Sequence, residues 1–359
     1  MRITSVEASN WRNFTTLEFD LRTRLFIVGP NAAGKSNLLD LFRFLGDVAA
    51  PGGGLAAAIE RRGGLGRVRS LFARNHRGGR LVVDVRLQDE EHAWRYLLAI
   101  KGEGRGRNRP LVDEEIVERD GERILQRPDR EDERDPERLT QTHLEQITAN
   151  QPFRAVAEHF ARTRCFPVVP QIVRGAGSAG AAFAPFGGDL APRIDEAPVG
   201  TRRVRLRRVE AALRSAVPGF ESLAGRTELS GGTRRLAGLL WALVSFPENG
   251  GVLLLEEPEL SLAPSIVRTL PAVLATAQRD RGRQVLLSTH ALELLDDEGV
   301  HAEEILVLRV AGDGTASELL SGIEEAVPQL EAELPASEIV RGLVSPEDPA
   351  GLLAIGARR

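Results

Sequence analysis

The segment from Gly29 to Ser36, which reads Gly-Pro-Asn-Ala-Ala-Gly-Lys-Ser, constrains this chain more than any other feature. It directly follows a short apolar run, Leu25 to Val28, and precedes apolar residues that recur at helical spacing. A glycine loop between a buried strand and a helix turns backbone N–H groups toward an anion, and the helix N-terminus adds its positive end. The segment therefore predicts a phosphate-binding loop in an α/β fold.

The residue types within this loop suit nucleotide phosphates and a divalent cation. Gly29 and Gly34 allow the turn and the close approach of phosphate to backbone. We expect Lys35 to reach the β- and γ-phosphates and the Ser36 hydroxyl to bind Mg²⁺. Lys35 is one of only two lysines among 47 basic residues, and a planar guanidinium does not replace a compact ammonium freely. The remaining residues expected to line the nucleotide are Pro30, Asn31, Ala32, Ala33 and Asn37.

Two further apolar strands end in residues that carry chemistry. The run Val252 to Leu255 is followed by Glu256 and Glu257, and the next apolar strand ends at His290. We expect Glu256 to hold Mg²⁺ through water and Glu257 to orient and deprotonate an attacking water. Because ligands bind at the ends of strands in open parallel sheets, we expect His290 to contact the γ-phosphate.

A second anion site is predicted 195 residues after Lys35, at Leu-Ser-Gly-Gly-Thr. Ser230 can cap the helix that follows, and Gly231 and Gly232 leave backbone N–H groups exposed at its positive end. An ordinary capped helix would give the same pattern. Since one nucleotide fills its own loop, the more economical interpretation is that this site caps the γ-phosphate held by a second protomer.

Composition excludes several classes of protein. The chain has 359 residues and a net charge of −4, and its longest nearly apolar stretch is eleven residues, against roughly 18 for a membrane span. A single cysteine, Cys165, rules out an internal disulfide and fits a reducing compartment. Residues 1–12 lack the apolar core of a secretory signal. We expect a cytoplasmic protein that does not enter a membrane.

Strands alternate with helices in the last third of the chain, which predicts a mostly parallel central sheet. We assign residues 1–45 and 225–310 to a nucleotide-binding core, with an antiparallel β part near the N-terminus. Residues 46–224 are predicted to form an inserted, irregular and partly helical lobe, and 311–359 a strand and helix extension. Within the lobe, 113–137 holds twelve acids and five arginines and predicts a solvated strand pair or loop, while 175–200 predicts a long loop.

The order of these motifs resembles that of an ABC-type P-loop NTPase. More narrowly, the chain resembles the RecF-like and SMC-like ATPases, a group of AAA-family predicted ATPases that is related to the ATPase half of OLD-family proteins. Asn10 to Phe14 is similar to the N-terminal motif of that group, and Glu257 to Pro264 is similar to its Glu-Pro-Glu segment. The resemblance implies Mg²⁺-dependent ATP hydrolysis, an ATP-dependent homodimer or higher homo-oligomer, and contact of Arg12 with the nucleotide.

Four departures from the pattern of the group are visible. Ala32 stands where many relatives have glycine, which is harmless if its φ is negative. Glu256 replaces the commoner aspartate, Ala263 replaces a frequent histidine, and Thr233 replaces the glutamine found in transporter subunits. The metal-binding glutamine of such sites has three candidates, of which we favour the last: Gln88, Gln151 and Gln171.

Two arginine-rich stretches suggest a partner. Residues 61–80 hold seven arginines and no acid, and residues 202–208 hold five arginines. Such clusters can neutralise DNA or RNA phosphates, although a solvated arginine-rich face is an equally good interpretation. The expected function is an ATPase coupled to DNA or to an effector, such as a nuclease acting in trans, in DNA repair or antiviral defence. The alternative is the ATP-binding subunit of a membrane transporter; a GTPase is excluded because no Asn-Lys-x-Asp segment is present.

Overall fold

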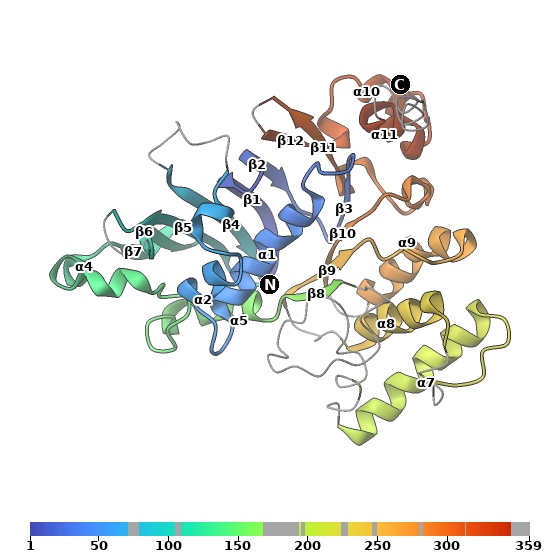
Figure 1. The fold of residues 1–359 in the computed structure, drawn as a ribbon, viewed down its shortest axis with the longest axis horizontal. Coiled ribbons are helices and arrows are strands. Elements are labelled where there is room, and N and C mark those ends of the chain that lie inside the picture. Colours follow the sequence, from blue (N-terminus) through green and yellow to red (C-terminus); the bar gives the residue numbers. More distant parts are fainter. Residues whose placement is uncertain are drawn as a thin grey trace, which may run out of the picture.

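The structure is a computed structural model, and it describes residues 1–70, 79–104, 109–167, 194, 198–223, 229–245, 250–279, 283–312 and 314–345. Its described strands form two six-stranded sheets, one antiparallel and one mostly parallel (Figure 1). Gln171 and the predicted loop 175–200 lie outside the described residues, apart from Ile194 and residues 198–200.

The antiparallel sheet has the strand order β2-β1-β4-β5-β6-β7, and every pair of neighbours in it is antiparallel. It contains the N-terminal antiparallel part expected from the sequence and extends it by four strands. The strands are β1 (Arg2–Trp11), β2 (Phe14–Asp20), β4 (Leu81–Gln88), β5 (Ala93–Gly102), β6 (Pro110–Arg119) and β7 (Glu122–Arg127).

The second sheet has the order β12-β11-β3-β10-β9-β8. Its pairs are parallel except for β11 with β12. The carboxyl ends of β3, β9 and β10 therefore lie at one edge, where the predicted site residues follow each strand. The strands are β3 (Arg24–Val28), β8 (Arg164–Pro167), β9 (Val252–Glu256), β10 (Gln284–Ser288), β11 (Ile305–Ala311) and β12 (Gly314–Leu319).

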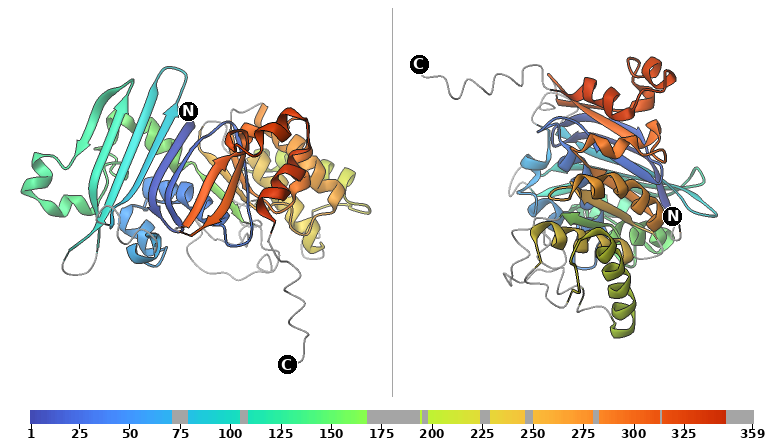
Figure 2. Two further views of the ribbon diagram at one scale, coloured as in Figure 1. Left: turned by 90° about the horizontal axis from the view of Figure 1, so that it is seen from above. Right: turned by 90° about the vertical axis from the view of Figure 1, so that its right-hand side faces the viewer.

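Burial on both faces explains why the strands of the parallel sheet read as continuous apolar runs. In β3, Leu25 and Ile27 join a core that also contains side chains of the antiparallel sheet and helix α1 (Lys35–Ala49). Phe26 and Val28 point to the other face, into a core shared with α9 (Pro264–Arg279) and α11 (Ala336–Val344). Figure 2 shows the two sheets and the helices from two further sides.

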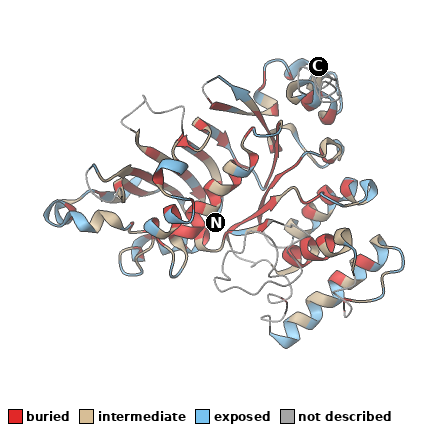
Figure 3. Ribbon diagram, viewed as in Figure 1, coloured by how far each residue is buried: buried red, intermediate tan, exposed pale blue. Residues whose placement is uncertain are grey.

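A third core joins helices α7 (Val199–Ala216) and α8 (Gly231–Ser245) through residues such as Leu213 and Trp241. The outer side of α7 is largely exposed (Figure 3). The other described α-helices are short: α2 (Leu55–Glu60), α3 (Leu65–Val68), α4 (Arg130–Arg134), α5 (Arg154–Ala161) and α10 (Val327–Glu331). The 3₁₀ helices are η2 (Pro136–Thr140), η3 (Gln151–Phe153), η5 (Leu292–Asp296), η6 (Ala302–Glu304) and η7 (Leu320–Gly322).

The acidic stretch 113–137 contains the strand pair that the sequence predicts, β6 with β7, but it is not solvated throughout. It forms β6, β7 and α4, and it buries an ion-pair network in which the side chains of Glu115, Arg127 and Asp132 are each 0% exposed. Arg127 donates to both carboxylates, at 3.1 Å to Glu115 and 2.8 Å to Asp132. Glu115 also accepts from the backbone N–H groups of His143 and Leu144. The mutual pairing of these charges offsets the cost of removing them from water.

The predicted division at residue 46 does not follow the sheets. β4, which belongs to the predicted lobe, pairs with β1, and β8, from the same stretch, pairs with β9. Strand pairs thus cross the predicted boundary between core and lobe. The division of the chain into core, lobe and extension stays a prediction. No helix in the described part of the chain is both long enough and apolar enough to cross a membrane.

Candidate nucleotide-binding site

The loop between β3 and α1 requires glycine at two positions. A Cβ atom on Gly34, which has φ +96°, would lie 2.1 Å from the Asn13 side-chain nitrogen. A Cβ atom on Gly29 would lie 2.6 Å from the backbone oxygen of Leu308. The first turn of α1 also leaves N–H groups without partners in the helix. The loop is thus a narrow backbone cradle whose shape suits an anion at the start of α1.

The Lys35 ammonium folds back over this cradle. Its Nζ donates to the backbone oxygens of Gly29, at 2.9 Å, and Pro30, at 3.1 Å. Burial lowers the pKa of Lys35, while the nearby carboxylates of Glu257 and Glu259 raise it. The ammonium is therefore held by two hydrogen bonds to backbone oxygens, and phosphate oxygens can replace these acceptors.

Ala32 does not meet the condition under which an alanine in place of glycine would be harmless, which was a negative φ. Its φ is +65°, in the left-handed region that favours glycine. Holding an L-residue there costs about 1–2 kcal/mol. The loop keeps this conformation because its neighbours fix it: Ala33 is fully buried, and its carbonyl accepts from Asn13 and Thr315.

The expected metal ligands on the described residues lie together. The Ser36 hydroxyl donates to Glu256 Oε1, which joins the first turn of α1 to the end of β9. Hydroxyl and carboxylate oxygens suit Mg²⁺. Among the described residues no group of three or more His, Cys, Asp or Glu side chains could hold a metal by itself. A Mg²⁺ ion here would need phosphate oxygens and water as further ligands, and the third predicted ligand, Gln171, lies outside the described residues.

Glu257 and His290 face each other from neighbouring strand ends. His290 Nε2 lies 3.3 Å from Glu257 Oε1, and the side chains are 41% and 28% exposed. Glu257 has φ +44°, a conformation that costs a non-glycine residue of order 1–3 kcal/mol. Its N–H donates to the Ser288 backbone oxygen at 2.9 Å. Both side chains are accessible to water, and they are in contact with each other. A general base must reach a water molecule, and a residue beside it can reach the γ-phosphate that this water attacks.

Glu259 is a residue of this site to which the sequence analysis gave no role. Its Oε1 accepts from the Thr289 hydroxyl at 2.7 Å and from the His290 N–H at 2.9 Å, and the residue is 7% exposed. Its Oε2 is buried without a hydrogen-bond partner. Glu259 therefore fixes the backbone that carries His290. Its place in the Glu-Pro-Glu segment was the only signal in the sequence.

In the N-terminal motif, Asn13 hydrogen-bonds to the loop, whereas Arg12, the expected nucleotide contact, pairs with helix α1. Asn13 donates to the carbonyl of Ala33 at 2.9 Å and accepts from the Asn37 side chain at 2.7 Å. Arg12 pairs with Asp40 on α1 at 2.7 Å and is 24% exposed. Contact between Arg12 and a nucleotide stays a prediction, and Asn37 holds the N-terminal motif through its side chain.

Ser230 caps α8 as the sequence predicts. Its Oγ accepts from the Thr233 N–H at 3.1 Å, and its carbonyl accepts from the Arg234 N–H. Ser230 is exposed, and Gly231 and Gly232 begin the helix. Among the described residues, no hydrogen bond or ion pair joins 230–232 to the loop at 29–36. The structure brings together all the other described strand-end residues of the predicted site but does not join this segment to them.

In the basic stretch 61–80, three of the seven arginines pair with carboxylates among the described residues, whereas Arg67 is exposed. Arg62 is buried and pairs with Asp40 and Asp47 at 2.8 Å. Arg61 pairs with Asp47, and Arg80 pairs with Asp113 and Glu114. Residues 71–78 lie outside the described residues. The stretch 202–208 lies on α7, where three arginines are exposed: Arg203, Arg207 and Arg208.

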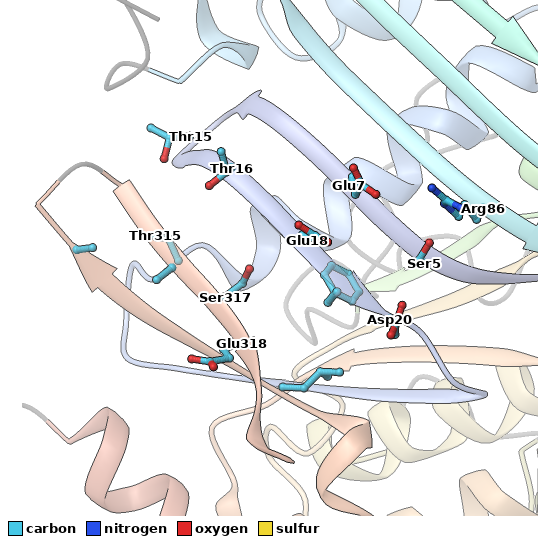
Figure 4. A pocket seen from close by; sticks show the side chains of 14 residues that line it. Ser5, Glu7, Thr15, Thr16, Glu18, Asp20, Arg86, Thr315, Ser317 and Glu318 are labelled. Carbon is cyan, nitrogen blue, oxygen red and sulfur yellow. The ribbon is translucent and has the colours of Figure 1, made fainter. Parts of the chain in front are cut away.

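A separate groove of about 910 Å³ lies between β2 and β12 (Figure 4). Glu7 and Glu18, which are directly opposite each other on β1 and β2, line it together with Asp20 and Glu318. Four carboxylates against one guanidinium, that of Arg86, disfavour the binding of phosphate in this groove. It reaches the back of the loop through Thr315, whose hydroxyl donates to Ala33.

The chain matches a protein-family model, and it is similar to curated proteins and to solved structures. The family model described as "AAA domain, putative AbiEii toxin, Type IV TA system" matches residues 25–296. Among curated proteins, the chain is 34% identical over 120 residues to the nickel import ATP-binding protein NikO of Rhodobacter capsulatus, covering 32% of this chain and 46% of that protein. It is 38% identical over 85 residues to the methionine import ATP-binding protein MetN of Cereibacter sphaeroides, covering 23% of each. The chain thus spans less than half the length of these relatives.

Among solved structures, the SMC head domain from Thermotoga maritima is similar with a TM-score of 0.51 and 14% identity, covering 89% of this chain and 99% of that one. An SmcHead bound to the C-winged helix domain of ScpA gives a TM-score of 0.51 and 12% identity, covering 91% and 100%. At such identities the likeness concerns the fold alone. It supports the ABC-type α/β class predicted from the sequence.

Proposed function

The chain belongs to the AAA-domain family whose model covers residues 25–296, and we propose that it hydrolyses Mg-ATP in sites shared between two protomers. One observation carries the proposal: a single edge of the parallel sheet brings together Lys35, Ser36, Glu256, Glu257 and His290. Phosphoryl transfer needs positioning and charge neutralisation more than covalent chemistry, and this set supplies both.

Each residue has a distinct part in the proposed reaction. The cradle at 29–36 would bind the phosphates, with the Lys35 ammonium neutralising the β- and γ-phosphate oxygens. Ser36 and Glu256 would hold Mg²⁺, which neutralises charge that develops on the phosphates. Glu257 would accept a proton from the attacking water, and His290 would donate to the γ-phosphate. The contact between His290 and Glu257 supports their acting on neighbouring atoms.

The two-protomer part of the proposal depends on Ser230 to Gly232. This segment is an exposed, capped helix start, which is suited to an anion, and it makes no hydrogen bond or ion pair to its own loop among the described residues. In a symmetric dimer each protomer's segment would cap the γ-phosphate on the partner's loop.

Sedimentation of Glu257→Gln with ATP tests this arrangement. We expect the variant to form dimers with ATP, because slow hydrolysis preserves the bound nucleotide, and to remain monomeric without it. Adding Ser230→Arg should prevent dimerisation while ATP binding to the monomer stays near that of the parent, since the cradle is unchanged. Thr276→Arg, on the exposed side of α9, is the control for a new arginine. Dimers that form equally well with Ser230→Arg would contradict the shared site.

DNA is the partner that we propose for α7, in keeping with a role in DNA repair or antiviral defence. This helix carries six arginines and one glutamate, and the exposed Arg203 and Arg207 lie one turn apart. Such a row can follow a phosphate backbone. An effector protein, such as a nuclease in trans, is the alternative partner.

Charge reversal on α7 tests DNA binding. We expect Arg203→Glu, Arg207→Glu and Arg208→Glu together to weaken binding to unrelated duplexes. They should also flatten the slope of log affinity against log salt by roughly 0.9 per lost phosphate contact. Arg130→Glu with Arg134→Glu, exposed on α4, is the control. An unchanged slope would show that α7 does not bind the backbone.

The runner-up function is the ATP-binding subunit of a membrane transporter, as in the import proteins that the chain partly matches. Those matches extend over 120 and 85 residues, whereas the family model extends from 25 to 296. Isolation of the native protein with trapped ATP distinguishes the two functions: a permease would support transport, and DNA or an effector would support our proposal.

A further inference from the structure

Helix α8 contacts the segment that follows β9 at two points. At its first turn, a Cβ atom on Gly232 would lie 2.5 Å from the backbone oxygen of Ser261, so only glycine allows this approach without a shift. One turn later, Arg235 Nη2 donates to the backbone oxygen of Glu257 at 2.6 Å. The helix that begins at Ser230 is therefore joined directly to the backbone of the proposed general base.

Arg235 makes this contact as a buried cation. It is 3% exposed, and its Nε has no hydrogen-bond partner. Burial lowers the pKa of Arg235, and the carboxylates of Glu259, Glu257 and Glu256 raise it. Removing a charge from water costs several kcal/mol, which an apolar side chain of similar size would avoid. Packing alone does not require a charged side chain here, whereas the hydrogen bond to the Glu257 carbonyl requires a donor such as arginine.

The backbone of Glu257 is held from both sides. Its carbonyl accepts from Arg235 and from the Leu260 N–H, and its N–H donates to Ser288. These contacts hold a residue whose φ is +44°. A change at the carbonyl would let the peptide relax and turn the carboxylate away from His290, because the direction of a side chain depends on its backbone.

We propose that Arg235 is a positioning residue that couples the Ser230–Gly232 segment to Glu257 in the same protomer. The proposal rests on the proposed function. Contact of Ser230–Gly232 with the nucleotide on a partner's loop would shift α8 or fix its position. Because Arg235 on α8 hydrogen-bonds to the Glu257 backbone, this change in α8 would alter the position of Glu257 in the protomer's own site. Each site would then hydrolyse ATP only when its protomer also engages the other nucleotide.

Arg235→Met tests the coupling, since methionine is long and apolar but cannot donate. We expect kcat to fall about 10²-fold, the loss that a misplacement of about 1 Å can cause. KM for ATP should stay within about twofold, because the cradle is untouched. ATP-bound dimers should accumulate although Glu257 is intact, which damage to the fold alone would not produce. Arg235→Lys, which keeps a donor, should recover part of kcat.

Arg283→Met is a matched control. Arg283 is also 3% exposed, and its Nη1 donates at 2.6 Å to the backbone oxygen of Leu243, near the other end of α8. The substitution removes the same kind of contact between α8 and the parallel sheet, away from Glu257. We expect a comparable loss of stability, no accumulation of ATP-bound dimers and a kcat within about threefold of the parent.

The outcomes separate this inference from the proposed function. If Glu257→Gln slows hydrolysis and accumulates dimers but Arg235→Met matches Arg283→Met, the coupling is wrong and the proposed function stands. If Glu257→Gln does neither, the proposed function itself fails. Should Arg235→Met not fold, Arg235→Lys decides: a reduced kcat with accumulated dimers supports the coupling, and parental turnover overturns it.

Discussion

Replacing Lys35 with alanine is expected to abolish ATP binding. The ammonium lies over the cradle at 29–36, bonded only to the backbone oxygens of Gly29 and Pro30 among the described residues. Without it, the β- and γ-phosphates lose the nearest cation, and charge-assisted hydrogen bonds are the strongest available to them. Equilibrium binding of a labelled, non-hydrolysable ATP analogue measures the effect.

The other lysine of the chain supplies the control. Lys101 is 45% exposed on β5 and pairs with Asp113 at 2.8 Å, away from the loop. Lys101→Ala should bind the analogue as the parent does. An affinity of Lys35→Ala within about twofold of the parent, a difference near 0.4 kcal/mol, would show that this loop does not bind the phosphates.

Glu257→Gln is expected to bind ATP and Mg²⁺ and to hydrolyse ATP far more slowly. The amide keeps the size of the carboxylate but cannot accept a proton from water, and a positioned base typically contributes about 10²–10⁴-fold. Single-turnover hydrolysis at saturating ATP measures this rate separately from binding.

Glu256→Gln distinguishes the two neighbouring carboxylates. Glu256 accepts from Ser36, so its loss should raise the Mg²⁺ concentration needed for half-maximal hydrolysis, whereas Glu257→Gln should leave that concentration unchanged. If Glu256→Gln leaves both the rate and the Mg²⁺ requirement intact, the assignment of the metal ligand is wrong. If Glu257→Gln hydrolyses within about tenfold of the parent, the assignment of the base is wrong.

The parallel sheet could be predicted because its strands are short apolar runs that end in chemically distinctive residues. β3, β9 and β10 were expected near their observed positions, as was the start of α8 after Ser230. The strand pair within 113–137 was predicted, but its buried ion pairs were not, because charge alone does not reveal that Arg127 is placed between Glu115 and Asp132. Nor does sequence show that β4 pairs with β1 across more than sixty residues.

The site residues that belong to sequence motifs could be predicted. Those that join the site only through contacts with residues distant in the sequence could not. Asn13 and Thr315 meet at the carbonyl of Ala33 although they are 302 positions apart. Arg235 reads as one more arginine in an arginine-rich chain until its contact with Glu257 is seen. The positive φ of Ala32 likewise comes from the loop around it, since alanine itself does not favour that conformation.

The central claim is that each ATP is hydrolysed between the loop of one protomer and Ser230–Gly232 of another. Mixing Lys35→Ala with Ser230→Arg tests it most directly, because a head-to-tail heterodimer joins one intact loop to one intact capping segment. Each variant alone should be inactive and stay monomeric with ATP, whereas the mixture should sediment as an ATP-dependent heterodimer, because it contains one complete site. If the two sites act independently, this heterodimer also recovers up to about half the turnover of the parent dimer; if Arg235 couples them, it does not. Dimers of Ser230→Arg alone, or a mixture that stays monomeric with ATP, would contradict the account.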